Sequence, residues 1–217
     1  MKKRVVIVGA TPFSTLMRRY LEQGAFEVLA YAVETAFLKA DELDGLPLVA
    51  YERLAEHFPS GEVNLLNTVG YVQMNGVRAR LHAFGQGMGY GFVTYVHPSA
   101  VVNSEIGAGS IVLENASIGF RNRVGIGTVI WQNVAIAHDC QVGDFTYWGP
   151  GAIACGNVHV GKRCFIGAGA ILRNRITVAD ECLAGAGVYM NRSVNEPGTV
   201  FRAPYPDQLD KKSSEIF

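Results

Sequence analysis

The chain has 217 residues, with 19 basic and 19 acidic side chains and 49% hydrophobic residues. High apolar content at zero net charge predicts a folded globular protein, and the missing basic excess argues against a nucleic-acid partner. No stretch approaches the ~18 apolar residues of a membrane span, and the apolar run Val5–Ala10 is too short for a signal peptide, so we expect a cytoplasmic protein without a membrane partner.

The first half of the chain is predicted to alternate strands and helices. A buried strand over Val5–Val8 precedes Gly9 and a helix that ends at Gly24, and a second strand over Val28–Val33 ends at Glu34. The helix is expected to bury Leu16, Met17, Tyr20 and Leu21. Later segments continue the pattern: a strand at 47–49, a helix at 52–58, a strand at 63–66, a helix with Met74, Val77, Leu81 and Phe84 at helical spacing, and a strand at 92–96. We therefore predict an α/β, Rossmann-like domain over residues 1–97.

A ligand of this domain is expected where the strand ends meet a helix N-terminus. The loop Gly9-Ala10-Thr11-Pro12-Phe13-Ser14 has one glycine where a dinucleotide site has G-x-G-x-x-G, so NAD binding is not expected. A nucleoside diphosphate suits it better, with Thr11 and Ser14 as donors and Glu34 facing a ribose or base. The loop around Gly70 is expected at the same edge, near a sugar. An α/β scaffold without a ligand is the alternative.

A period of six residues organises the second half. Every sixth residue from Ile106 to Ala184 is apolar, fourteen in succession, and glycine often follows directly. Glycine there suits a tight corner. The residue four places after each apolar one is usually small or β-branched. Such repeats indicate a parallel β-helix, in which each coil buries its inward side chains on those of its neighbours.

The same period sorts inward from outward side chains. Cys140, Cys164 and Cys182 fall on the small inward position, which predicts a packing role. Cys155 falls at a corner and is also interpreted as structural, with a reactive thiol as the alternative. The outward apolar residues are expected to form subunit contacts or a ligand groove, with scattered surface aromatics as the alternative. These are Phe120, Ile126, Trp131, Phe145, Tyr147 and Phe165.

Two motifs extend this interpretation: the junction His97-Pro98-Ser99-Ala100, and the segment from Asn133 to Asp144 that contains His138-Asp139-Cys140. With the α/β first half, they resemble the hexapeptide-repeat acyltransferases, specifically the sialic acid O-acetyltransferase family, which includes bacillosamine and perosamine N-acetyltransferases. The resemblance covers about residues 4–200. It implies a left-handed parallel β-helix over residues 98–194 and a homotrimer with active sites between chains. Residues 195–217, with three prolines, are predicted to form an extended tail.

The resemblance also implies an activity: transfer of an acyl group, expected to be acetyl, from acyl-CoA to the amine of a nucleotide-linked deoxyamino sugar, for surface polysaccharide or lipopolysaccharide biosynthesis. His138 is the candidate general base and Asp139 its orienting carboxylate. The repeat independently places His138 at an outward corner, and a neutral imidazole is suited to accept a proton near pH 7. No metal is expected. The candidate nucleotide-sugar residues are Gly9, Thr11, Pro12, Phe13, Glu34 and Gly70, and the candidate acyl-CoA residues are Tyr147, Gly167, Ala168, Gly185 and Ala186.

Three other functions stay open on the sequence. O-acetyl transfer to a sugar hydroxyl would use the same residues. A non-catalytic binding scaffold would explain Pro12, Phe13 and Trp131, which depart from the family pattern. A metal-dependent hydrase on this fold needs three converging histidines, whereas the repeat holds only His138 and His159.

Overall fold

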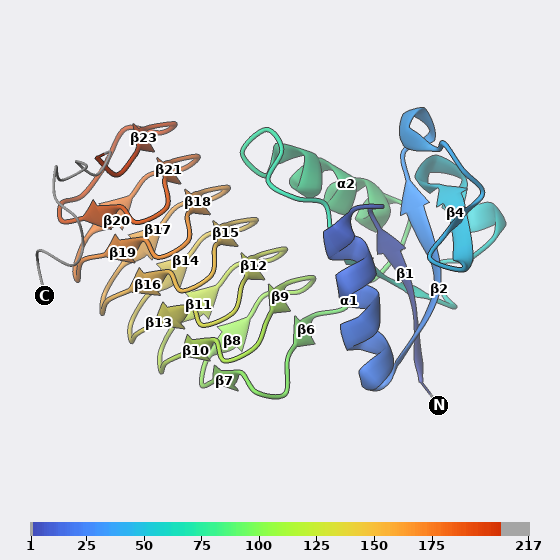
Figure 1. The fold of residues 1–217 in the computed structure, drawn as a ribbon, viewed down its shortest axis with the longest axis horizontal. Helices are drawn as coiled ribbons and strands as arrows, with labels where there is room; N and C mark the ends of the chain where they lie inside the picture. Colours follow the sequence, from blue (N-terminus) through green and yellow to red (C-terminus); the bar gives the residue numbers. More distant parts are fainter. Residues whose placement is uncertain (1, 205–217) are drawn as a thin grey trace, which may run out of the picture.

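The computed structural model describes residues 2–204 and shows two parts lying end to end: an α/β region and a long stack of coils (Figure 1). The α/β region has one sheet in the order β3-β4-β2-β1-β5, parallel except for the pair β3–β4. Its strands are β1 (Lys3–Val8), β2 (Phe26–Val33), β3 (Glu42–Leu43), β4 (Leu46–Ala50) and β5 (Asn64–Asn67). The expected alternation of strands and helices is confirmed.

Two helices accompany this sheet, and their buried faces differ from the prediction. In α1 (Pro12–Gln23), Met17 and Leu21 are buried as expected, but Leu16 is exposed. In α2 (Gly76–Gly87), the buried face carries Arg78, Leu81 and His82, whereas Phe84 is exposed. The apolar pattern misplaced this face because α2 lies against the coils through polar side chains.

The remaining helical segments are short 3-10 turns. They are η1 (Thr35–Phe37) and η2 (Tyr51–Glu56). The helix expected at 52–58 is therefore wrong in type and length. Pro59 follows directly, and a proline disfavours the helical conformation in the residue before it.

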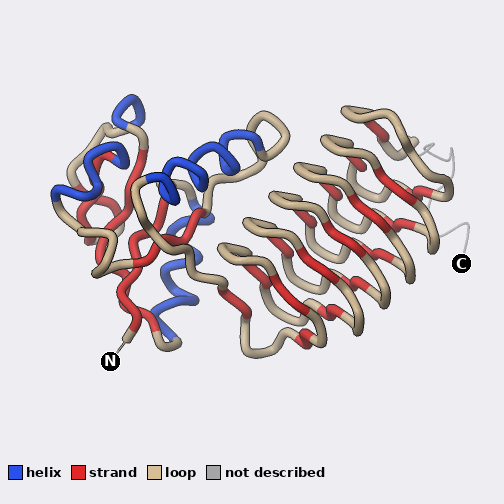
Figure 2. The backbone as a smooth tube through the Cα atoms, turned by 180° about the vertical axis from the view of Figure 1, so that it is seen from behind, coloured by secondary structure: helices blue, strands red, loops and turns tan. Residues whose placement is uncertain are grey.

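The second part is a three-faced parallel β-helix, consistent with a left-handed one, and Figure 2 shows its short strands stacked coil on coil. We call the first sheet the apolar face; it contains β22 (Tyr189–Met190), β19 (Ile171–Leu172), β16 (Ile153–Ala154), β13 (Ala135–Ile136), β10 (Ser117–Ile118) and β7 (Val101–Val102). The second, the polar face, contains β20 (Thr177–Val178), β17 (His159–Val160), β14 (Gln141–Val142), β11 (Arg123–Val124) and β8 (Glu105–Ile106).

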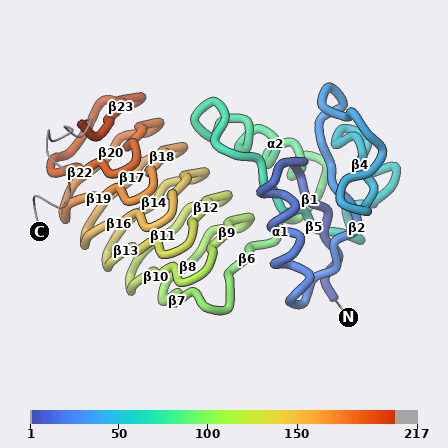
Figure 3. The backbone as a smooth tube through the Cα atoms, in the orientation of Figure 1, coloured from blue at the N-terminus to red at the C-terminus, as the bar shows by residue number. Residues whose placement is uncertain are grey.

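The third sheet, which we call the covered face, faces the α/β region. It contains β23 (Val200–Phe201), β21 (Leu183–Ala184), β18 (Phe165–Ile166), β15 (Tyr147–Trp148), β12 (Val129–Ile130), β9 (Ile111–Val112) and β6 (Tyr95–Val96). β6 pairs with β9, so the chain enters the coils before residue 98. Figure 3 follows it from there to the far end.

The six-residue period predicted the core correctly. Apart from the half-buried Ile106 in the first coil, the repeated apolar residues are buried, and so are all the residues four places later. Cys140, Cys164 and Cys182 are among these, which confirms their packing role. Burial raises the pKa of the Cys164 thiol to about 12, so it stays protonated.

The glycines that follow the apolar residues stand where little side chain fits, as predicted, and it is the next coil that leaves no room. A Cβ on Gly107 would lie 2.4 Å from the Gly125 carbonyl carbon in the next coil. Glycine is therefore required for close stacking of coils. The left-handed backbone of each corner falls two residues later instead, as at Asp139 (φ 58°) and Arg121 (φ 58°).

The last coil includes part of the predicted tail. β23 pairs with β21, so residues 200–201 belong to the β-helix and the extended-tail prediction is wrong for them. Residues 205–217 lie outside the described part of the chain. Within residues 2–204, neither helix has the length and apolar character that crossing a bilayer requires.

Most of the outward aromatic residues cover a contact within the chain. Phe13 packs on Trp131 with ring centroids 4.9 Å apart, Tyr71 packs on Phe165 at 4.9 Å, and His82 meets Phe145 at 5.2 Å. For Trp131, Phe145, Tyr147 and Phe165 a contact within the chain takes the place of the predicted subunit contact, because the period shows which side chains point outward but not what covers them. Phe120 does lie exposed, and Ile126 is half-buried.

Candidate active site

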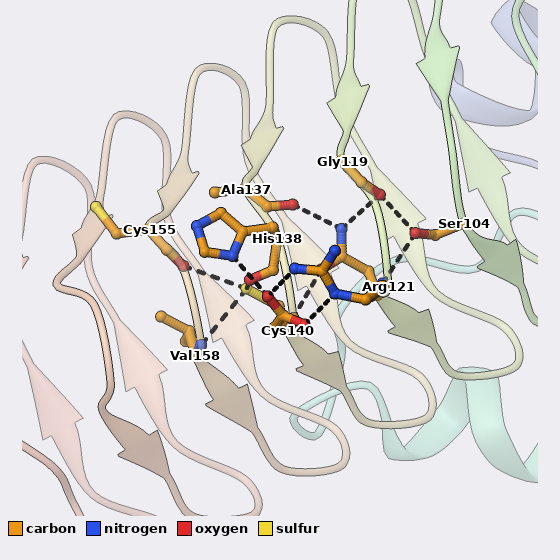
Figure 4. Close-up of polar contacts among 10 residues, drawn as sticks. Ser104, Gly119, Arg121, Ala137, His138, Cys140, Cys155 and Val158 are labelled. Carbon is orange, nitrogen blue, oxygen red and sulfur yellow. Dashed lines mark hydrogen bonds and ion pairs between the residues drawn. The ribbon is translucent and has the colours of Figure 1, made fainter.

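His138 and Asp139 occupy the corner between β13 and β14, where the apolar face meets the polar face. His138 is exposed over 57% of its side chain. Its Nδ1 lies 2.7 Å from Asp139 Oδ2 (Figure 4). A carboxylate only accepts hydrogen bonds, so Nδ1 carries a proton, and in the neutral ring the lone pair is on Nε2. The corner thus presents an oriented imidazole whose Nε2 is the atom available to take up a proton.

Asp139 has a second partner that sequence reasoning missed. Arg121 Nε donates to Oδ1 at 2.6 Å and Arg121 Nη2 donates to Oδ2 at 2.7 Å (Figure 4). These hydrogen bonds, followed by the one from His138, hold the pKa of the Asp139 carboxyl well below its usual range. Asp139 is therefore ionised throughout the neutral range. Arg121 precedes it by 18 residues, one full coil, and this spacing was the available signal.

The backbone around His138 is held by the coils on either side. From the preceding coil, buried Asn122 accepts from Cys140 N at 2.7 Å and donates to the Ala137 carbonyl at 2.7 Å. From the following coil, Asn157 N donates to the His138 carbonyl at 2.9 Å. A Cβ on Gly156 would lie 2.7 Å from His138 Nε2, so a larger residue there would displace the ring from this position.

The candidate acyl-CoA residues divide into two groups. Gly167, Ala168, Gly185 and Ala186 stack in adjacent coils at the edge where the covered face meets the apolar face, and the two alanines are exposed. A Cβ on Gly167 would lie 2.5 Å from Ala186 N, so the edge is backbone stacked on backbone. Tyr147 is not at this edge. It is buried on the covered face and stacks on Phe165 at 5.2 Å.

The apolar face separates this edge from His138. Its outward side chains in the middle and last coils are Ala135, Ile153, Ile171 and Tyr189. Ile153 and Ile171 are each 36% exposed and Tyr189 is 59% exposed. Within one chain, the imidazole and the edge with Ala168 thus lie on opposite borders of an apolar strip.

The candidate nucleotide-sugar residues all follow the carboxyl ends of β1, β2 and β5, which share one edge of the sheet. Thr11 caps α1 in a reciprocal capping box with Ser14, ahead of Pro12 in the first turn. Gly9 has φ 124°, and a Cβ there would lie 2.8 Å from Thr68 Oγ1. This turn is compact, its capping box uses the Ser14 N–H, and Pro12 has no N–H to offer.

The other residues of this set are engaged by arginines. Arg80 donates to both oxygens of Glu34, at 2.8 and 3.0 Å. The Gly70 carbonyl accepts from Arg78 Nη1 at 3.2 Å. Phe13 points instead toward Trp131. The structure brings the set to one edge but not into one cluster.

No group of three histidine, cysteine or acidic side chains is arranged to hold a metal ion within residues 2–204. Among these side chains His138 has one acidic neighbour in contact, Asp139.

The comparisons with known proteins agree with this fold. A family profile described as bacterial transferase hexapeptide (six repeats) matches residues 139–174. The acetyltransferase domain of PglB from Neisseria gonorrhoeae is similar over 92% of this chain and 96% of its own, with TM-score 0.81 and 22% identity. No curated protein is significantly similar in sequence.

Two further solved structures match over most of their length. PerB from Caulobacter crescentus, in complex with CoA and GDP-perosamine, has TM-score 0.79 and 25% identity, covering 88% of this chain and 90% of its own. WeeI from Acinetobacter baumannii has TM-score 0.67 and 20% identity, and the match covers 90% of this chain and 97% of its own. These matches bear out the resemblance to the hexapeptide-repeat acyltransferases.

Proposed function

We propose that this hexapeptide-repeat protein is an N-acyltransferase, which moves an acyl group, with acetyl the expected one, from acyl-CoA to the amine of a nucleotide-linked deoxyamino sugar. The observation that carries this proposal is the His138 imidazole, which an ionised Asp139 orients through Nδ1 and whose side chain is 57% exposed. The fold is shared with PerB, described with CoA and GDP-perosamine, and with the PglB domain, described with acetyl coenzyme A. Both reactants are charged cytoplasmic metabolites, which supports a cytoplasmic location.

The reaction needs one proton acceptor. The sugar amine attacks the thioester carbonyl carbon and forms a C–N bond, while its proton passes to His138 Nε2. The tetrahedral intermediate then collapses, the C–S bond breaks, and the imidazolium returns the proton to the departing thiolate sulfur. Asp139 stabilises the transient imidazolium without taking a proton itself. The products are the amide and free CoA thiol.

The α/β region is the proposed acceptor-binding part, as a Rossmann-like unit. Its parallel strands end beside the N-terminus of α1, which is where α/β units of this kind place a nucleotide. The β-helix corners between residues 106 and 184 have no long inserted loop. The acceptor must then gain much of its binding from the α/β region, which favours a sugar that carries a nucleotide.

A direct assay tests the reaction class. We expect acetyl-CoA to release free thiol with one member of a panel of UDP-, dTDP- and GDP-linked amino sugars. Each is matched to the same sugar with a hydroxyl in place of the amine. Release with the amine alone supports N-acyl transfer. Release with the hydroxyl sugars alone would establish an O-acyltransferase, and silence with short and long acyl-CoAs would establish a non-catalytic scaffold.

A homotrimer is part of this proposal, because the candidate residues are split within one chain. The apolar face lies between His138 and the edge with Ala168. Packing three such faces around a threefold axis would bury Ile153 and Ile171 and bring the His138 border of one chain toward the Ala168 edge of the next. This arrangement completes a site that a single chain leaves divided.

A charge on the apolar face should therefore abolish assembly and activity together. We expect the wild type to have the mass of three chains by light scattering, and Ile153→Asp to have the mass of one and to lose most of its turnover. The matched control is Thr177→Asp on the exposed polar face, which should stay trimeric. A trimeric Ile153→Asp variant would show that this face is not the interface.

A further inference from the structure

We propose that Arg121 is a positioning residue that tunes the basicity of His138 through Asp139. This inference goes beyond the proposed function but rests on His138 being its base. The geometry that carries it is a shared carboxylate: Asp139 Oδ2 accepts from His138 Nδ1 at 2.7 Å and from Arg121 Nη2 at 2.7 Å. Arg121 Nε holds the other oxygen at 2.6 Å. The Arg121 guanidinium thus binds both carboxylate oxygens of Asp139, a contact that we call the fork.

The fork affects the imidazole in two ways. First, it fixes the plane of the carboxylate, because a planar guanidinium that binds both oxygens leaves little rotation about the side chain. The imidazole hydrogen-bonded to Oδ2 is fixed with it, so Nε2 keeps one direction. Second, it neutralises much of the carboxylate charge that stabilises an imidazolium. A lone carboxylate would make His138 more basic and leave less of it neutral at pH 7.

The surroundings of His138 make this pair the main electrostatic influence. The groove beside it is lined by Arg121, Asp139, Glu105 and Arg123 as its charged groups, and by the Cys140 thiol. In the following coil the titratable groups beside this corner are Cys155 and His159, and the corner between them carries uncharged Gly156 and Asn157. Burial raises the pKa of the Cys140 thiol, so it stays neutral. Glu105 and Arg123 are exposed on neighbouring strands and offset each other.

Asn122 has a separate role at the same corner. Its side chain bonds backbone groups: the Gly119 carbonyl in its own coil, and Ala137 and Cys140 on either side of His138 and Asp139. Asn122 thus fixes the main chain, whereas Arg121 contacts a side chain and acts on its charge. The two effects are separable by experiment.

The test is the pKa of His138, measured by NMR titration of the imidazole in the unliganded protein, with His138→Ala to assign the signal. We expect Arg121→Met to raise it by about 0.5 to 1 unit, from the loss of one nearby cation in a partly solvated site. Arg121→Lys, which keeps the charge without the fork, should shift it less. Asp139→Asn should lower it. The Arg121 effect should shrink in 1 M salt.

The matched control is Arg123→Met, which removes a neighbouring exposed cation that does not contact Asp139. Its effect on the His138 pKa should be clearly smaller. Equal shifts in the two arginine variants, or none in Arg121→Met, would overturn the proposal. This readout needs no turnover, so it is separate from the proposed function. If the wild type were inactive but the titration shifts were as expected, the proposed acyltransferase activity would be contradicted and the role of Arg121 would still be supported.

Kinetics provide a second readout for an active wild type. The acid limb of kcat/KM should move to higher pH in Arg121→Met, so that its activity is low at pH 7 and recovers at higher pH. A purely structural Arg121 would lower activity equally at every pH. An Arg121 that binds substrate phosphates would raise KM without moving the limb. Either result would contradict the tuning role.

Discussion

Replacing His138 with alanine is expected to lower kcat by about 10²-fold or more, the usual contribution of a positioned general base. The variant loses the only imidazole held at this corner and keeps the rest of the site. His138→Asn is the closer test, because its amide can still donate to Asp139 but cannot accept the amine proton. Both variants should be slow to a similar degree. The measurement is thiol release at saturating acyl-CoA and acceptor.

The two variants should fold and bind acyl-CoA normally, because His138 is exposed and its side chain contacts Asp139 rather than the core. Calorimetric titration with CoA therefore serves as their control. The dependence of kcat/KM on pH should change as well. In the wild type its acid limb is expected to follow His138, whereas in these variants it should follow the amine of the acceptor. Turnover of His138→Ala within a few-fold of wild type would mean that another group removes the proton.

The coil architecture was predictable because a six-residue repeat imposes the same environment again and again. Thirteen positions four places after the apolar anchors are buried, including three cysteines that a motif search would set aside as reactive. The exposed corner of His138 followed from the same register. Asp139 followed because the two are adjacent, so that any corner presenting the ring also brings the carboxylate near it.

Arg121 was missed for a physical reason. A β-helix makes neighbours of residues 18 apart, and arginine at an exposed corner has no special pattern of its own. What distinguishes Arg121 is that it lies in register with Asp139 on the neighbouring coil. A second scan at a period of 18, made for opposite charges rather than apolar side chains, would have found both Arg121–Asp139 and Arg163–Glu181.

The contact between the two parts of the chain was not predictable from hydropathy. The face of α2 that meets the coils carries Arg78 and His82, residue types that sequence patterns assign to solvent. The His82 ring instead stacks on Phe92 at 3.7 Å, and burial lowers its pKa to about 4. Neutral at physiological pH, it behaves as an aromatic packing residue.

Arg78 supplies the second large effect that we predict. Arg78 is 1% exposed, and its guanidinium donates to the carbonyls of Gly127 at 3.1 Å and Phe145 at 2.9 Å in the coils, and of Gly70 at 3.2 Å in the α/β region. Burial lowers its pKa to about 9, so it is still charged at neutral pH. The backbone carbonyls thus replace the water that the charge has lost, and they join the two parts of the chain.

Arg78→Met should accordingly lower the free energy of unfolding by about 3–4 kcal/mol, because several buried carbonyls lose their donor at about 1 kcal/mol or more each. Arg80→Met is the matched control on the same helix. Its partner Glu34 lies at the surface, and such exposed pairs contribute less than about 1 kcal/mol. Urea unfolding at one fixed chain concentration compares the two. If Arg78→Met costs no more than Arg80→Met, the carbonyls have found other partners and the two parts of the chain are held together by the aromatic contacts alone.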